Sequence, residues 1–323
     1  MSATVETPPH SGPSTRRPRL LHGMVWAVWR QHRTAFAVLL AAAAAGAAWM
    51  TYQRFGTADL LHQGLTGEDL RRTMKDAYGH ALEETAGYLV VLPLAIGVFL
   101  GAPLVSGDRE HGTDRLMTTQ SVTRGRWIAT KLGVTVAVVL LSTGLLSAAF
   151  TWWWHSARPI NDLWDLGGTF DTTGPVLPAL CLLYLAVGIA IGALARRMLT
   201  AMVLTAVAGY GLSFVWDRIR LVWQAPRVLT SPITGTWPQL PDGAVEHDRW
   251  LTTDSGRLYG WGNCIPHRNP EPCLKEKGIT GYRLEYFGFD QMSPLQWTGA
   301  AVLLAVAVAL LGAVLWWIRR RPL

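Results

Sequence analysis

The sequence predicts an all-α integral membrane protein, a six-helix transmembrane bundle with an N-terminal interfacial helix and a larger extracellular loop domain between spans five and six. Half of the 323 residues are hydrophobic and only 16% are charged, whereas soluble domains carry about 25% charged residues. Charge is missing from six windows, each near the length of ~20 apolar residues that crosses a bilayer. None of these windows has a polar face at helical spacing, which argues against a large soluble helical core.

The six windows are the predicted transmembrane spans, and none of them contains Asp, Glu, Lys, Arg or His. Transporters driven by protons or sodium ions usually keep such groups inside the membrane. Their absence argues against a transporter that energises itself, although one that binds its ion through backbone carbonyls stays possible. The predicted spans are Thr34–Met50, Tyr88–Val105, Leu132–Trp154, Pro175–Ala195, Leu199–Trp216 and Leu295–Ile318.

The N-terminal region has two predicted parts. Residues 1–19, rich in Pro, Ser, Thr and Arg, are expected to be a disordered tail. Residues 20–33 are predicted to form a short helix at the membrane interface, with tryptophans at headgroup depth and arginines beside them. The alternative is that this segment only begins the first span. Cleavage as a twin-arginine signal sequence is disfavoured because five further spans follow. The expected anchors are Trp26, Trp29, Arg30 and Arg33.

Basic residues orient the chain in the membrane. Arginines lie near the start of the chain, between spans four and five (Arg196, Arg197) and in the tail 319–323. The positive-inside rule therefore predicts a multi-pass plasma-membrane protein whose N- and C-termini are both cytoplasmic. This charge follows the span ends and does not gather on one face of a folded domain. Membrane lipid is therefore an expected partner and nucleic acid is not.

Two regions are predicted outside the cell. Residues 51–87 should be partly helical, with the Thr66 hydroxyl capping a helix whose first turn is acidic. Residues 217–294 are dense in Pro, Gly, Trp and Tyr and include strand-like pieces such as Arg283–Phe289. Because this segment is too long for a simple connector, it is predicted to be a folded extracellular domain.

Cys264 and Cys273 enclose a proline-rich loop in the second outer region and are predicted to form a disulfide. Thiols outside the membrane meet oxidising conditions. A zinc site that uses His267 is the alternative, but four ligands are not in evidence, so no metal is expected. Cys181 lies within the fourth span and is expected to be a small buried hydrophobic side chain.

The second and fourth spans contain prolines and glycines that affect the backbone. Pro93 and Pro103 each remove a backbone donor and should bend the second span. Gly97 to Gly101 and Gly188 to Gly192 are patterns in which small residues four apart let two helices approach closely. Packing within one chain and a seam between two subunits are both consistent with these patterns.

No catalytic motif emerges. The chain lacks HExxH and GxSxG motifs, and the dipeptide Gly-Lys does not occur, so there is no Walker A site. The sequence therefore predicts a protein that is not an enzyme and binds no cofactor itself. An intramembrane enzyme would need inward-facing catalytic groups, and the spans offer only Ser, Thr and Tyr.

The most informative segment is the polar loop 106–131 between spans two and three, whose charges exclude it from hydrocarbon. In the predicted orientation it is cytoplasmic. Thr113 can cap a short helix that begins at Asp114, and Leu116 and Met117 would then need cover from another surface. Thr123 can cap the next helix, whose basic residues should reach the headgroups and whose tryptophan should lie in the aromatic belt. These further anchors are Arg124, Arg126, Trp127 and Lys131.

The motifs of this loop resemble a known family. The stretch Gly107–Leu116, which contains Glu110-His111-Gly112-Thr113, resembles the E-x-G-T stretch after the second span of ABC-2 type exporter permeases. Ser121–Trp127 is similar to that family's P-V-S-R lead into span three, with Ser121 where Pro is usual. Trp29–Arg33 resembles an N-terminal signature of actinobacterial members. The six-span layout and the large outer loop also fit, whereas loop 51–87 is longer than the family pattern.

The resemblance implies a function for the whole chain. In that family the permease pairs with a separate ABC ATPase subunit, which binds the ATP, and with a second permease, identical or different. The loop between spans two and three is the coupling helix that docks on the ATPase. The residues that this carries over are Glu110, Gly112, Thr113, Asp114, Arg115, Leu116 and Met117.

A different class of function stays open. A membrane-anchored binding or assembly protein would act through its extracellular domains and would not transport anything. The sixteen tryptophans suit contact with lipid, glycan or peptide. For the exporter, the apolar, uncharged bundle suits an amphipathic or lipid-like cargo. A neighbouring gene for an ABC ATPase would discriminate between the two functions.

Overall fold

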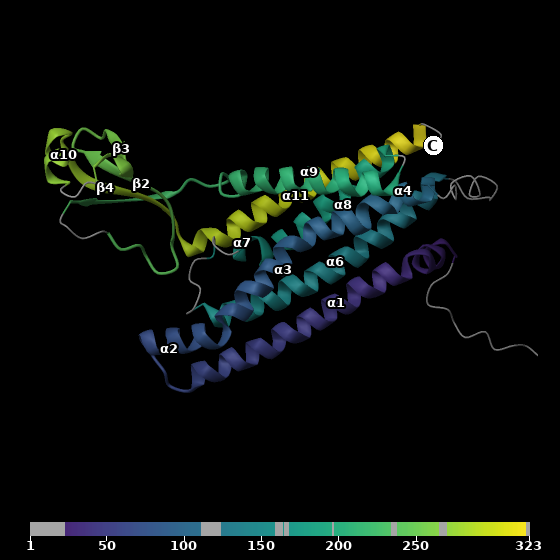
Figure 1. Ribbon diagram of the computed structural model, residues 1–323, viewed down its shortest axis with the longest axis horizontal. Helices are drawn as coiled ribbons and strands as arrows, with labels where there is room; N and C mark the ends of the chain where they lie inside the picture. The colour runs from purple at the N-terminus through teal and green to yellow at the C-terminus, as the bar shows by residue number, and fades with distance from the viewer. Residues whose placement is uncertain are drawn as a thin grey trace, which may run out of the picture.

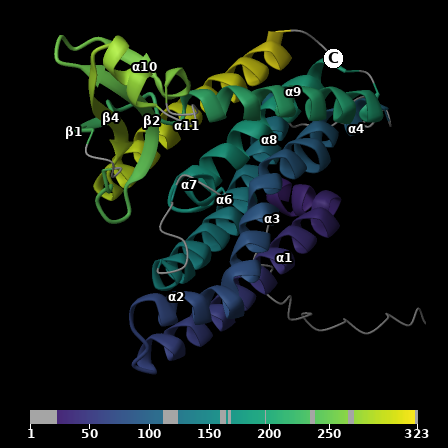
Figure 2. The ribbon, with the colours of Figure 1, turned by 60° about the vertical axis from the view of Figure 1, so that its left-hand side comes forward.

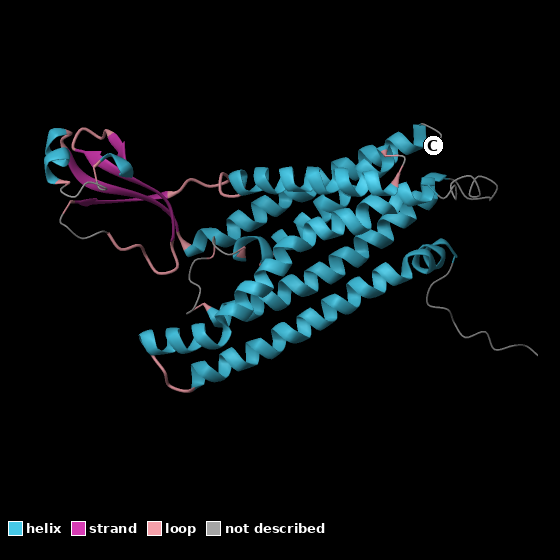
Figure 3. Ribbon diagram, viewed as in Figure 1, coloured by secondary structure: helices cyan, strands magenta, loops and turns pink. Residues whose placement is uncertain are grey.

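The computed structural model describes residues 23–110, 124–158, 164, 168–195, 197–233, 238–264 and 270–320. A bundle of long helices carries a small sheet at one end, while the chain's C-terminus lies at the other end (Figures 1 and 3). We refer to these as the sheet end and the C-terminal end of the bundle. Six helices are long and apolar enough to cross a membrane. Five contain a predicted span in full, and the fourth, Val176–Leu194, matches the predicted span Pro175–Ala195 to within one residue at each end.

The helices alternate in direction between the two ends. The π-helical segments η1 and η2 interrupt the second membrane-spanning helix and so divide it into α2, α3 and α4. The bounds are α1 Gly23–His62, α2 Gly67–Met74, η1 Lys75–Gly79, α3 His80–Ile96, η2 Gly97–Gly101, α4 Ala102–Glu110, α6 Arg124–Ala157, α7 Thr169–Thr172, α8 Val176–Leu194, α9 Met198–Ile219 and α11 Phe289–Arg320.

The N-terminal segment is not a separate interfacial helix in the part that the structure describes. Helix α1 is continuous from Gly23 to His62, which agrees with the alternative that the segment begins the first span. The reason is packing, because Val28 and Phe36 are fully buried against Val138 of α6. A helix lying flat on the membrane would leave that side uncovered.

The first outer region is more helical than expected. Helix α1 reaches His62, and α2 starts only five residues later, so a helical hairpin projects at the sheet end (Figure 1). Thr66 occupies the predicted N-cap position of α2 with extended backbone, but its side chain makes no cap hydrogen bond. The acidic first turn of Glu68 and Asp69 is as predicted and suits the helix dipole.

Helix α8 is the centre of the bundle and packs against α3, η2, α4, α6, α9 and α11 (Figure 2). Its residues are almost all buried, as expected for a helix that is apolar on every side. The surrounding helices instead expose large apolar side chains, such as Val207 and Tyr210 of α9, which are 68% and 76% exposed. Apolar surface on this scale is not stable in water and matches a lipid environment.

The small-residue patterns of the second and fourth spans face each other within one chain. A Cβ added to Gly97 would lie 2.8 Å from the carbonyl oxygen of Tyr184, and one added to Gly188 would lie 2.3 Å from that of Gly97. These glycines therefore form the seam between α8 and the segment η2, which follows Pro93. Of the two possibilities that the sequence left open, the structure has the packing within one subunit.

The region between α9 and α11 contains a four-stranded antiparallel sheet, so the description as all-α is wrong for this part. The strand order is β1-β4-β2-β3, and β4 pairs with both β1 and β2 along its length. Ile279 and Tyr282 of β4 lie in a small core with Leu251 of β2, whereas Phe287 of β4 lies in the main core of the bundle. The strands are β1 Arg227–Pro232, β2 Val245–Thr253, β3 Leu258–Gly260 and β4 Ile279–Phe287.

The sheet is anchored to the bundle by several contacts. Strand β4 leads directly into α11, and Arg227 of β1 donates a hydrogen bond to Asp290 of α11 at 3.0 Å. The Trp164 indole N–H donates to the carbonyl of Gly243 at 3.1 Å. Val245 and Phe287 belong to the main core of the bundle. These few contacts join the sheet to the end of the bundle, beyond which it projects (Figure 1).

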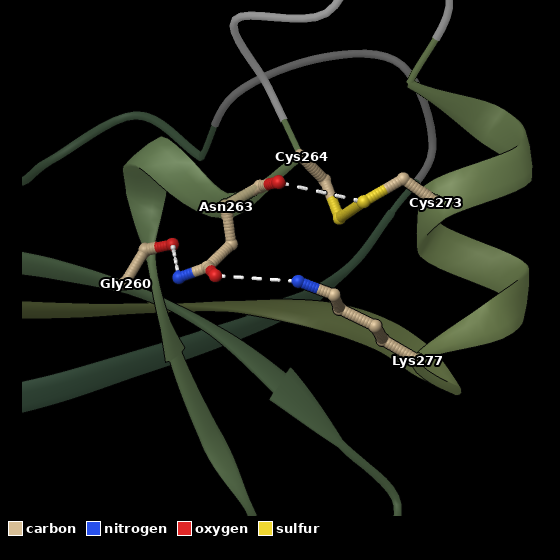
Figure 4. The surroundings of a disulfide bond; sticks show 5 residues. All are labelled: Gly260, Asn263, Cys264, Cys273 and Lys277. Carbon is tan, nitrogen blue, oxygen red and sulfur yellow. Dashed lines mark hydrogen bonds between the residues drawn. A yellow bond between two sulfur atoms is a disulfide. The ribbon is translucent and has the colours of Figure 1, made fainter.

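The predicted disulfide between Cys264 and Cys273 is confirmed, with Cα atoms 5.6 Å apart. It joins the end of η3 (Trp261–Asn263) to α10 (Glu271–Glu276), and Figure 4 shows its surroundings. Beside it, Lys277 Nζ donates to Asn263 Oδ1 at 3.2 Å, and Asn263 Nδ2 donates to the Gly260 carbonyl. Because Cys264 lies in the small core with Leu251 and Tyr282, the cross-link closes this region around its own apolar centre.

Candidate functional site

The candidate site lies at the C-terminal end of the bundle, where the polar loop leaves α4 and returns into α6 (Figure 1). Residues 111–123 lie outside the described residues, and with them the predicted coupling residues Gly112, Thr113, Asp114, Arg115, Leu116 and Met117. What the structure places is the base of the loop. We define the loop root as the side chains of Gln31, Asp108, Glu110 and Lys131 together with the backbone N–H of Met198.

Asp108 joins three helices in the loop root. Its Oδ2 accepts a hydrogen bond from Lys131 Nζ of α6 at 2.7 Å, and its Oδ1 accepts one from Gln31 Nε2 of α1 at 2.9 Å. The side chains of Lys131 and Asp108 are 3% and 25% exposed. An ammonium group with so little water contact needs a carboxylate partner, because an unpaired buried charge is costly.

Lys131 is therefore not the headgroup anchor that the sequence predicted. It was placed at the interface because it ends a basic stretch before an apolar span. Instead its side chain points into the bundle and pairs with Asp108. Twenty-three residues separate the two in sequence, and no periodic pattern relates them. Only the antiparallel arrangement of α4 and α6 brings them together.

Glu110 makes the second connection of the loop root. Its Oε2 accepts a hydrogen bond from the backbone N–H of Met198 at 2.8 Å. Met198 is the first residue of α9, and the N–H groups of a first turn have no partner within the helix. A carboxylate at this position also suits the positive end of the helix dipole. Glu110, predicted from its motif as a coupling residue, thus caps another helix of the same chain.

The other predicted anchors divide into two groups. Trp26 and Arg30 are exposed and contact each other, with the guanidinium carbon 5.1 Å from the ring centre, as expected at a membrane interface. Arg33 and Arg126 are also exposed. Trp29 and Trp127 instead pack against the buried cluster between α1 and α6. Arg124 is the first residue of α6, and its side chain lies outside the described part of the chain.

Sequence reasoning missed Gln31 and Asp108. Gln31 lies within the stretch 29–33 that resembles a family signature, but nothing in the stretch marked the amide as a link to another helix. Asp108 is one of several acids in a loop assigned to water. A charged residue three positions beyond the end of a predicted span could have signalled a partner, because such a group lies close to the low-dielectric region.

The loop root joins four helices at one end of the bundle: Asp108 links α4 to α1 and α6, and Glu110 links α4 to α9. Among the residues that the structure describes, no group of three or more His, Cys, Asp or Glu side chains could hold a metal ion. The one ammonium group of the loop root, that of Lys131, faces Asp108, and the second carboxylate, that of Glu110, faces the N-terminus of α9.

The comparisons with known proteins point in the same direction. A family model described as "ABC-2 membrane transporter related" matches residues 40–220, more than half of the chain. The match runs from the middle of α1 to the first residue after α9, so it includes the polar loop and leaves out the sheet and α11. No curated protein and no solved structure matches the chain.

Proposed function

Because this chain belongs to the ABC-2 membrane transporter related family, we propose that it is the permease subunit of an ATP-driven exporter. In this proposal the chain forms the translocation pathway together with a second permease. ATP is bound and hydrolysed on a separate ATPase subunit, which docks on residues 111–123. Both termini face the cytoplasm, so the C-terminal end of the bundle is the cytoplasmic end and the sheet lies outside the cell.

The observation that carries the proposal is the loop root. Both ends of the polar loop are fixed to the bundle, through Asp108 and Glu110 on one side and Lys131 on the other. Because both ends are fixed, a displacement of the loop would reach the helices and would not be absorbed by flexible backbone at its base.

The need for an energy source outside this chain supports the same function. The six apolar windows contain no ionisable side chain, and the chain has no phosphate-binding loop of its own. Closure of the ATPase subunits would move residues 111–123 as a lever. The loop root would then carry the ends of α1, α4, α6 and α9 along together and so change which end of the pathway is open.

Docking is tested by co-purifying the chain with candidate ABC ATPase subunits. Leu116→Asp places a charge on the predicted docking face and should reduce the retained ATPase at least tenfold. Leu258→Asp is the matched control, because Leu258 is an exposed leucine of the sheet at the opposite end. Equal retention by the two variants would show that the loop is not the docking surface.

Two variants of Glu110 distinguish a role in coupling through the loop root from a role in direct contact with the ATPase. Glu110→Gln keeps an acceptor for the Met198 N–H, whereas Glu110→Ala removes it. We expect the Gln variant to retain nearly normal transport-linked ATPase activity and the Ala variant to lose most of it, with both still binding the ATPase. If both variants lose ATPase binding, Glu110 is a docking residue and not a cap.

The sheet favours a second candidate function, in which the chain is a membrane-anchored binding or assembly protein. The sheet lies outside the family match and has a disulfide and a core of its own. This function requires neither an ATPase nor transport. If no candidate ATPase subunit is retained, and if ATP does not affect the protein's activity in cells, the binding function is the correct one and the exporter function is not.

A further inference from the structure

Two cavities adjoin at the sheet end of the bundle. The larger, which we call the tail cavity, has a volume of about 820 Å³ and lies between α6, the turn before α8 and the start of α11. The smaller, the head cavity, has a volume of about 490 Å³ and lies between α2, the end of α6 and the loop before β2. His155 lines both cavities.

The tail cavity follows a single stripe of α6. Its α6 lining from Gly144 to His155 recurs at helical spacing, at residues 144, 147, 148, 151, 152, 154 and 155. Eleven residue steps at ~1.5 Å each give about 16 Å, close to the hydrocarbon depth of one leaflet. A Cβ added to Gly144 would meet no atom within 4 Å, so small residues create the space.

The polar groups that line the tail cavity are largely satisfied within the protein. Ser147 Oγ donates to the Gly174 carbonyl at 2.6 Å, and Thr151 Oγ1 accepts from the Gly174 N–H at 3.0 Å. Gln296 Nε2 donates to Thr173 Oγ1 at 2.8 Å. Their bonds turn these groups toward the protein, and Asp290, the acid among the lining residues, accepts a hydrogen bond from Arg227. The rest of the lining is mainly aromatic and aliphatic. Such a cavity suits hydrocarbon better than a polar ligand.

Two partly exposed tryptophans line the tail cavity. Trp152 of α6 and Trp297 of α11 both line it and are 46% and 65% exposed. Both lie at the sheet-end limit of predicted spans, where tryptophan prefers the membrane interface. A molecule could therefore enter from the leaflet without passing through water.

The head cavity is cationic. Arg71 of α2, Arg158 and His155 line it, and Asp242 is the acid among its lining residues. The Arg158 guanidinium carbon lies 4.0 Å from the ring centre of Phe289, and Phe289 lines the tail cavity. Arg158 is thus held where the two cavities meet. Guanidinium groups bind phosphate oxygens in a forked geometry.

From this arrangement we infer that the two cavities form one binding site for a phospholipid with a net negative headgroup. An acyl chain occupies the tail cavity, and the headgroup phosphate lies between Arg158, Arg71 and His155. An apolar cavity at membrane depth beside a cationic cavity at the interface matches both parts of such a molecule. The inference goes beyond the proposed function and holds whether or not the chain transports anything.

Native mass spectrometry of the delipidated full-length protein tests this site, with phosphatidylglycerol as the probe. We expect one tightly bound lipid per chain. Arg158→Ala and Gly144→Leu should each weaken it at least tenfold, by removing the phosphate partner and by filling the tail cavity. The matched controls should bind like the unmodified protein. Arg218→Ala removes an arginine that also contacts an aromatic ring, and Gly133→Leu fills open space elsewhere on α6.

Two further probes test the headgroup phosphate and the acyl chains of the ligand separately. Diacylglycerol lacks the phosphate and glycerol phosphate lacks the acyl chains, so each should bind at least tenfold more weakly than phosphatidylglycerol. Equal binding of either probe, or unchanged lipid binding by both cavity variants, overturns the inference. If Arg158→Ala does not fold, Arg71→Ala is compared with its exposed neighbour Arg72→Ala, and equal lipid binding by this pair also overturns it.

Discussion

Lys131 shows how one residue can serve a different role from the one its sequence context suggests. Its ammonium group is only 3% exposed and depends on the carboxylate of Asp108. Two charges taken from water are costly, and their attraction offsets this cost only with good geometry. The hydrogen bond from Gln31 to the other carboxylate oxygen supplies further stabilisation and brings in α1. The pair therefore fixes one arrangement of three helices.

Removing one partner of this pair should destabilise the protein. Lys131→Met leaves Asp108 facing an apolar side chain, and the expected loss is about 3 kcal/mol, the usual cost of breaking a buried pair. Thermal unfolding in detergent measures it, with Lys275→Met, at an exposed position of the sheet region, as the charge-matched control. The double variant with Asp108→Asn should recover part of the loss. If Lys131→Met and the control melt together, the pair does not stabilise the bundle.

At the scale of helices, the seam between α8 and η2 depends on missing side chains. Gly97, Gly101, Gly188 and Gly192 bring backbone atoms of the two segments close enough that an added Cβ would lie within 3 Å of a carbonyl oxygen. The π-helical turn at Gly97–Gly101 follows Pro93 by four residues. The π-helical turn thus lies at the point where the glycines of the second span contact α8.

A single methyl group tests the seam. In Gly188→Ala the new Cβ would meet the Gly97 carbonyl oxygen at 2.3 Å, so the helices must separate, at an expected cost of about 1–3 kcal/mol. Gly211→Ala adds the same group to α9 where nothing lies within 4 Å, and it should be neutral or stabilise slightly because alanine favours helix. Melting temperatures of the two purified variants measure the contrast. A Gly188→Ala variant as stable as Gly211→Ala would contradict the seam.

At the scale of the whole molecule, the bundle could be predicted from sequence and the contacts between its parts could not. Hydrocarbon requires long apolar helices, and this requirement is visible in composition alone. The sheet has no comparable signal in the composition, since β1 and β2 mix charged, polar and apolar residues. Both pair with β4, which lies far along the chain. The Asp108–Lys131 and Glu110–Met198 contacts are equally invisible, because each joins segments that only the folded bundle brings together.

The positive-inside rule and the disulfide both predict the orientation of the molecule in the membrane. Basic residues gather at the C-terminal end of the bundle, whereas the disulfide lies in the sheet and favours an oxidising compartment. Single cysteines at exposed positions test this, since the native Cys181 is fully buried. In intact cells, an impermeant maleimide should label Ser255→Cys in the sheet and should label Arg320→Cys only after permeabilisation. The reverse pattern would place the sheet in the cytoplasm and residues 111–123 outside the cell. A cytoplasmic ATPase could not reach them there.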